Sequence, residues 1–196
     1  MQLPPFERNL DFWRQLWKIV ELSDVIVQVV DARDPLFFES SDLSIYVKEV
    51  DSRKESVLLL NKADLLTEEQ RKTWSKHFLD SDTKALFFSA TLEEESDGDL
   101  NLQEETEIEF GSSQILRPDQ ILSVLKNTMQ AAETVTVGFT GYPNVGKSST
   151  INRFLTTKKL QVSATPGKTK HFQVIFCYSL SHPSYNSFLY KPTYLV

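Results

Sequence analysis

Cysteine and histidine are scarce in this 196-residue chain, which limits the kinds of site it can build. The single cysteine, Cys177, excludes an internal disulfide framework and a zinc site made of cysteines. His77, His171 and His182 share no metal-ligand spacing, so we interpret them as surface or structural residues. One unpaired cysteine fits a reducing compartment, and we expect a cytoplasmic location.

Long hydrophobic runs are also absent. No apolar stretch approaches the roughly 20 residues that a membrane helix needs, and residues 1–7 have neither a basic nor an apolar signal region. We therefore expect no membrane segment. A hydrophobic content of 40% and a charged content of 24% are typical of a globular protein, with room for one α/β domain and its core. We expect a monomer.

Acidic residues outnumber basic ones overall, but they are concentrated in one segment. The net charge is −6, yet residues 93–109 contain nine acids and no base, so the rest of the chain carries +3. Because the segment is poor in apolar residues, we predict a disordered acidic insertion at about 93–112. Such an insertion would keep non-specific RNA away from a mildly basic body.

Apolar runs and helical spacings alternate along the chain. Helical spacing between residues 8 and 22 puts Leu10, Trp13, Trp17 and Val20 on one face, and we expect both tryptophans to pack in the core. We predict strands at 25–30, 57–60, 85–88 and 135–140, and helices through 43–50, 67–79, 118–131 and 148–155. The expected fold is a doubly wound, mostly parallel α/β sheet.

A glycine-rich loop follows the last predicted strand. Gly141-Tyr-Pro-Asn-Val-Gly-Lys-Ser148 has the spacing of a P-loop, in which glycines let successive N–H groups face a phosphate at a helix start. We expect Lys147 to reach the β- and γ-phosphates and Ser148 to hold Mg²⁺. The alternative is a plain glycine turn with a solvated lysine, and the flanking strand and helix argue against it. The other expected contacts are Gly141, Asn144, Val145, Gly146 and Ser149.

A second motif distinguishes guanine from adenine. Asn61-Lys62-Ala63-Asp64 follows the second predicted strand, and a carboxylate accepts from the N1 and N2 donors that only guanine presents. Asp64 is therefore the expected specificity residue, while Asn61 braces the phosphate loop and Lys62 lies along the base plane. Ser89-Ala90-Thr91 fits a second base-contact loop, with the Ala90 N–H facing guanine O6.

The order of these motifs is reversed relative to an ordinary small GTPase, in which the phosphate loop comes first. Asn61 stands about eighty positions ahead of Gly141. We interpret the domain as circularly permuted, which packing tolerates because domain termini usually lie close together. The helix at 118–131 would then join the original ends.

With this order, the chain resembles the YlqF/YawG family of circularly permuted GTPases. The resemblance covers about residues 6–173 and includes Asp31-Ala-Arg-Asp-Pro35 and Ala164-Thr-Pro-Gly-Lys-Thr-Lys-His-Phe-Gln173. It implies binding of GTP/GDP and Mg²⁺, and hydrolysis of GTP. Thr169 would close over Mg²⁺ and the γ-phosphate as a catalytic residue beside Lys147, and Thr165 is a weaker candidate. The family also implies a role in maturation of the large (60S) ribosomal subunit, whose precursor RNA and proteins would be the partners.

The sequence departs from this family in one motif. None of its twelve aspartates has a glycine three positions later, so the Asp-x-x-Gly γ-phosphate sensor is missing. We expect a truncated or alternatively terminated form, incomplete at its carboxyl end. We divide it into an N-terminal helix (1–22), the permuted domain (23–173) and a divergent tail (174–196), whose residues 174–178 would partly replace the strand beside 135–140.

Two functions therefore compete on the sequence alone. The first is a GTP hydrolase, and the second is a catalytically inert guanine-nucleotide-binding or interaction module. A third possibility, a P-loop ATPase or kinase, is disfavoured by Asp64.

Overall fold

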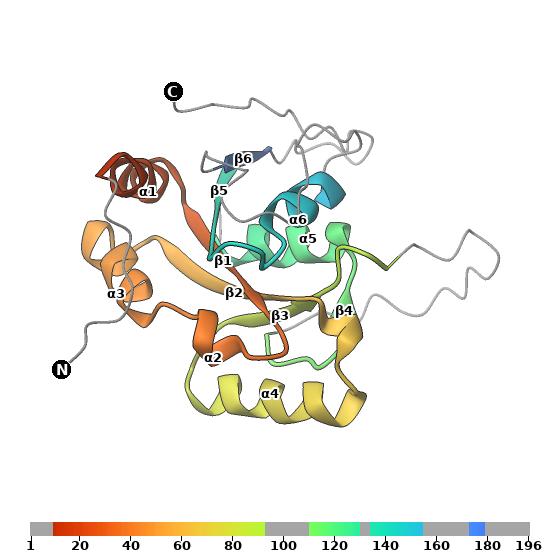
Figure 1. Cartoon of the computed structure of the whole chain (residues 1–196). Helices are drawn as coiled ribbons and strands as arrows, with labels where there is room; N and C mark the ends of the chain where they lie inside the picture. Colours follow the sequence, from red (N-terminus) through yellow and green to blue (C-terminus); the bar gives the residue numbers. More distant parts are fainter. Residues whose placement is uncertain (1–9, 93–109, 130–133, 155–172, 179–196) are drawn as a thin grey trace.

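The computed structural model describes residues 10–92, 110–129, 134–154 and 173–178 (Figure 1). Its central feature is a six-stranded sheet with the order β4-β3-β2-β1-β5-β6. The elements are α1 (Leu10–Leu22), β1 (Val25–Asp31), α2 (Pro35–Phe38), α3 (Ser41–Val50), β2 (Glu55–Asn61), the 3₁₀ turn η1 (Ala63–Leu65), α4 (Glu68–Asp80), β3 (Ala85–Phe88), β4 (Ile115–Leu116), α5 (Pro118–Thr128), β5 (Thr134–Thr140), α6 (Lys147–Phe154) and β6 (Gln173–Tyr178).

The sheet is mostly parallel, as predicted. β1 pairs in parallel with β2 and β5, and β2 and β3 continue the parallel order toward β4. β6 pairs antiparallel with β5, with Gln173 opposite Phe139 and Tyr178 opposite Thr134. The prediction that residues 174–178 take a place beside 135–140 is thus confirmed.

Helices cover both faces of the sheet, which makes the fold doubly wound (Figure 1). On one face, α5 and α6 pack over alternate strand residues such as Val27, Leu59 and Phe139. On the other face, α4 packs over Leu60 and Phe87. α1 and α3 cover the same side through a smaller cluster around Ile26. Every residue of β1 is buried, as expected for a continuous apolar run at the centre of a parallel sheet.

Two helix starts follow the predicted local chemistry. The Thr67 hydroxyl accepts from the Gln70 N–H at 3.3 Å, and the Gln70 side chain accepts from the Thr67 N–H at 2.9 Å. This capping box begins α4. Pro118 begins α5, where a missing N–H costs nothing. For the same reason Pro35, in the turn after β1, begins the short helix α2.

The expected core role of the α1 tryptophans is wrong. Trp13 is 39% exposed and Trp17 is 41% exposed, whereas Ile19 and Val20 are fully buried. Val20, on the predicted face, joins Ile19 in the buried cluster between α1 and its neighbours β5 and α3. An indole at the edge of a packed helix keeps part of its ring in water at little cost.

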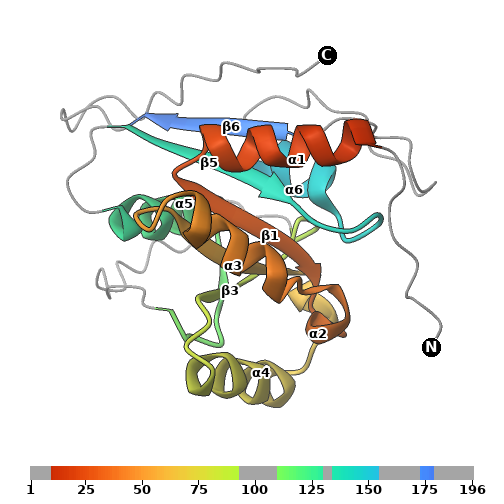
Figure 2. The same ribbon diagram turned by 90° about the vertical axis from the view of Figure 1, so that its left-hand side faces the viewer.

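α1 also approaches the backbone of β5 very closely (Figure 2). A Cβ placed on Gly138 would lie 2.4 Å from Ser23 Oγ and 2.6 Å from Ile19 Cγ2. The loop after α1 is bonded to the same strand, because Asp24 accepts from the Thr136 N–H at 2.7 Å and its own N–H donates to the Thr136 carbonyl at 2.8 Å. Only glycine fits at position 138.

The carboxyl end of the predicted acidic insertion is packed. Residues 93–109 lie outside the described residues, but Phe110 is half-buried against the main core cluster. The Ser75 hydroxyl donates to the Gly111 carbonyl, and Arg71 Nε donates to the Ser113 carbonyl at 3.1 Å. Both donors belong to α4, so this helix holds the approach to β4.

Candidate nucleotide site

The motif residues gather where the parallel strands end. The loops after β1, β2, β3 and β5 meet at the carboxyl edge of the sheet, and β1 and β5 are neighbours although β2, β3 and β4 lie between them in the sequence. In open α/β sheets, ligands bind at this edge. The topology therefore brings both predicted motifs to one place.

The phosphate loop has the backbone that its glycines permit. Gly141 has φ +145° and Gly146 has φ +97°. A Cβ on Gly141 would lie 2.3 Å from the Val29 carbonyl oxygen, and one on Gly146 would lie 2.3 Å from Asn61 Nδ2. α6 begins directly after the loop at Lys147. The loop is thus a narrow cradle at a helix N-terminus, where backbone N–H groups and the helix dipole favour an anion.

The Lys147 side chain lies back across this loop. Its Nζ donates to the carbonyls of Gly141 at 2.6 Å and Tyr142 at 2.7 Å. Burial lowers the pKa of the Lys147 ammonium from its ordinary value of 10.5 to about 8. Carbonyl oxygens solvate the ammonium only partly, so a phosphate would be a better partner.

Asn61 joins the base loop to the phosphate loop. Its side chain is buried, its Nδ2 donates to the Val145 carbonyl at 2.8 Å, and its Oδ1 accepts from the Ala90 N–H at 3.2 Å. The predicted brace from Asn61 to the phosphate loop is present. The Ala90 N–H, which the sequence assigns to guanine O6, is engaged by Asn61 in this structure.

Asp64 lies at the surface of the same edge, within η1. Its Oδ1 accepts from the hydroxyl of Ser89, a buried residue at the end of β3. The Ser89 hydroxyl also accepts from the N–H groups of Thr91 and Leu92, at 3.3 and 3.4 Å. Ser89 therefore fixes the orientation of a carboxylate that is open to a ligand, which is the arrangement a base-reading residue needs.

Lys62 links the guanine motif to β1 and to the phosphate loop through its ammonium group. Its backbone is left-handed, with φ 64°, and its Nζ donates to Asp31 Oδ2 at 2.8 Å and to the Asn144 carbonyl at 2.9 Å. Sequence reasoning missed Asp31 as a site residue. The available signal was its place at the end of a buried strand, level with Asn61. Burial by itself raises the pKa of the Asp31 carboxyl, but hydrogen bonds from Arg33 and Lys62 outweigh it and hold the pKa well below its usual range.

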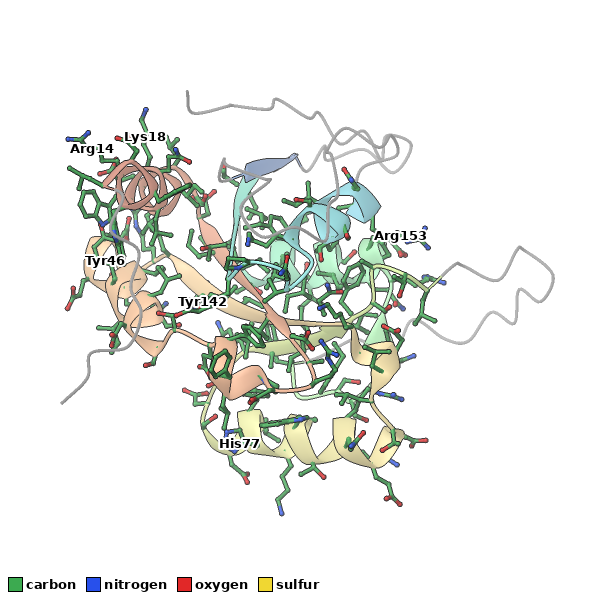
Figure 3. All side chains as sticks on the ribbon, viewed as in Figure 1. Arg14, Lys18, Tyr46, His77, Tyr142 and Arg153 are labelled. Carbon is green, nitrogen blue, oxygen red and sulfur yellow. The ribbon has the colours of Figure 1, made fainter. Side chains whose placement is uncertain are left out.

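The remaining residues predicted to bind the nucleotide or Mg²⁺ belong to the start of α6 and to the sequence before β6. Ser148 is buried and Ser149 half-buried in the first turn of α6. Thr169 and the weaker candidate Thr165 lie outside the described residues. Tyr142 points from the phosphate loop toward α2, where it meets the Phe38 ring edge to face at 6.2 Å (Figure 3).

Within the described residues, none of the helices is long and apolar enough to cross a membrane.

Comparisons with known proteins find relatives of this chain. A family profile described as 50S ribosome-binding GTPase matches residues 136–183. Large subunit GTPase 1 of Schizosaccharomyces pombe is 49% identical over 87% of this chain and 31% of its own length. The Saccharomyces cerevisiae protein of that name is 42% identical over 88% of this chain and 31% of its own length. The Drosophila melanogaster homologue is 41% identical over 89% of this chain and 37% of its own length. The chain thus spans about a third of the length of these relatives. The crystal structure of GNP-bound YlqF from T. maritima aligns with a TM-score of 0.49 and 22% identity, over 77% of this chain and 51% of that one.

Proposed function

Because the chain belongs to the family of the Large subunit GTPase 1 proteins, we propose that it binds GTP and hydrolyses it to GDP and phosphate. One observation carries the proposal. The Asn61 side chain donates to the Val145 carbonyl across 84 positions of sequence, so the guanine motif and the phosphate loop form one site in reversed chain order. A chance match of two motifs would not bring them into contact.

The residues present fit a nucleoside triphosphate. The glycine cradle leaves no room for a Cβ, the start of α6 favours negative charge, and Lys147 supplies a partly desolvated ammonium. Ser148, in the first turn of α6, would give its hydroxyl to Mg²⁺, which when bound neutralises phosphate charge. The Asp64 carboxylate would accept from guanine N1 and N2.

Hydrolysis by this site would be an in-line attack of water on the γ-phosphate. Lys147 would stabilise the negative charge that spreads over the γ-phosphate oxygens and the leaving oxygen. Thr169 would close over the γ-phosphate. Its distance along the chain supports this role, because Gln173 pairs with Phe139, two positions before Gly141, and four extended residues span at most about 14 Å.

The same family membership supports a cellular role. The relatives are named for the large subunit, and the matching family profile is described as ribosome-binding. We propose that the chain acts in maturation of the large ribosomal subunit in the cytoplasm. Co-sedimentation with large-subunit precursors in a non-hydrolysable GTP analogue but not in GDP would support this. Equal recovery in both nucleotides would contradict a nucleotide-controlled attachment.

Single-turnover hydrolysis of radiolabelled GTP tests the catalytic proposal. We expect the chain to release phosphate faster than its Lys147→Ala variant, and we expect unlabelled GTP, but not ATP, to compete. Equal rates with retained GTP binding would instead favour the inert guanine-nucleotide-binding module. Competition by ATP at the same concentration would point to an adenine-nucleotide enzyme.

Binding should also depend on pH through Lys147. Below pH 8 the ammonium is charged in both the free and the bound chain, so GDP affinity should be flat. Above pH 8 the free chain must take up a proton to bind the phosphates, so affinity should fall by up to about tenfold per pH unit. Calorimetric titration between pH 7 and 9 measures this.

The matched control for the pH experiment is Lys147→Arg, because a guanidinium stays charged throughout that range. Titration of the ligand itself affects both proteins equally. If GDP affinity begins to fall near pH 8 in both the unmodified chain and the Lys147→Arg variant, the titrating group is not Lys147.

A further inference from the structure

The Asp31 carboxylate accepts hydrogen bonds from its own turn, through Arg33, and one more from Lys62 on a neighbouring strand end. Its carboxylate accepts from the Arg33 N–H at 3.1 Å, from Arg33 Nε at 2.9 Å and Nη2 at 2.6 Å, and from Lys62 Nζ at 2.8 Å. The Asp31 side chain is only 5% exposed. Buried carboxylates of this kind are retained where every lone pair has a donor. The Asp31 carboxylate is therefore held by two separate sets of donors, one from Arg33 and one from Lys62.

The chain contains an internal comparison for the Arg33 contacts. Asp51 accepts from the Arg53 N–H at 2.9 Å, from Nε at 3.1 Å and from Nη2 at 2.8 Å, which repeats the same Asp-x-Arg clamp. Asp51 lies before β2, at the opposite edge of the sheet, and the cations that act on its carboxyl, Arg53 and Lys54, are its neighbours along the chain. An Asp-x-Arg turn thus forms without a lysine from another strand. The bond from Lys62 is the addition at Asp31.

That additional bond reaches the phosphate loop. The Lys62 ammonium lies between Asp31 Oδ2 and the carbonyl of Asn144, and Asn144 is itself left-handed with φ 64°. Left-handed residues other than glycine persist where their surroundings hold them in place. Lys62 and Asn144 both have this backbone, and they are bonded to each other. Asp31 anchors the pair to β1, the central strand of the sheet.

We propose that Asp31 is a positioning residue for guanine-nucleotide binding. By holding the Lys62 ammonium against the Asn144 carbonyl, it fixes the base-reading loop relative to the phosphate loop. The proposal rests on the proposed function for its ligand. It adds a residue that touches neither base nor phosphate but sets the spacing between the loops that contact them.

GDP affinity in a double-mutant cycle tests the proposal. We expect Asp31→Ala to weaken binding by about 10- to 100-fold, the loss of one hydrogen bond to a charged group. Asp31→Asn keeps an acceptor for Lys62 and should stay within a few-fold of the unmodified chain. Asp51→Ala removes the matching clamp at the far edge and should leave affinity unchanged.

The pair Asp31→Ala and Lys62→Ala decides whether Asp31 acts through the lysine. If it does, the double variant binds GDP no more weakly than Lys62→Ala alone. Losses that multiply would overturn the proposal, as would equal losses in Asp31→Ala and Asp51→Ala.

Hydrogen exchange on the nucleotide-free chain separates this proposal from the proposed function. Asp31→Ala should raise deuterium uptake in residues 61–64 and 141–146 together, whereas Asp51→Ala should raise it in neither. If the unmodified chain fails to bind GDP while this paired change appears, the proposed function fails and the loop anchor stands. Unchanged uptake in both loops would overturn the anchor itself.

Discussion

Asp64→Asn is expected to weaken GTP binding by about 10²- to 10⁴-fold, because two hydrogen bonds from guanine to a charged acceptor are disturbed at once. An amide presents one acceptor and one donor, so its NH₂ would face the donors of guanine. Ser89 would still orient the side chain, since its hydroxyl donates to the position of Oδ1. Competition against a fluorescent guanine nucleotide measures the change.

The same substitution should create a new preference. Xanthine carries a carbonyl where guanine carries its exocyclic amino group, so the side-chain amide of the Asp64→Asn variant would donate to the xanthine oxygen while accepting from N1–H. XTP should therefore compete better than GTP in the variant. Asp80→Asn, at the exposed end of α4, is the matched control and should retain the original preference. Undiminished selectivity for GTP over XTP in Asp64→Asn would remove Asp64 from base recognition.

Gly141→Ala is expected to abolish measurable nucleotide binding, a loss of at least about 100-fold, and to destabilise the fold by about 1–3 kcal/mol. The added Cβ would lie 2.3 Å from the Val29 carbonyl oxygen. Val29 belongs to the central strand β1 and pairs with Leu59, so its carbonyl has nowhere to move. The phosphate loop must shift instead. Denaturant unfolding and GDP titration report the two effects separately.

Gly111→Ala is the control for Gly141→Ala. Gly111 also has a positive φ, of 92°, but the nearest atom to its added Cβ belongs to the flexible Leu79 side chain, at 3.3 Å. It lies in the segment held by α4, away from the phosphate loop. We expect a loss of stability from backbone strain alone and unchanged GDP affinity. Equal GDP affinity in both variants would show that the cradle does not depend on Gly141.

Much of the site could be predicted because its chemistry is local. The residues of a phosphate loop are consecutive, so Gly141 to Ser148 indicate both the turn and the helix behind it. Asn61 lies far from Val145 in the sequence, but Asn61 ends one buried strand and Val145 lies in the loop after another, and parallel strands end at one edge. The strands are predicted from continuous apolar runs, which are also a local signal.

Two features could not be predicted from the sequence, the bond between Asp31 and Lys62 and the choice of buried residues in α1, because both depend on how separate elements pack together. The bond between Asp31 and Lys62 links two adjacent strand ends, and the Asp-x-Arg spacing at Asp31 also occurs at Asp51, so this spacing alone does not mark Asp31. In α1, the predicted face holds both the buried Val20 and the exposed Trp13 and Trp17. The close approach of α1 to β5 near Ile19 explains why the buried residues are Ile19 and Val20, close to the carboxyl end of the helix.

The glycine at position 138 lets α1 pack directly against the backbone of the strand that leads to the phosphate loop. Helix and strand are in contact at this point without a strand side chain between them. The loop at Gly141 is three residues farther along that strand. Any larger residue at position 138 would therefore separate α1 from β5 close to the start of the phosphate loop.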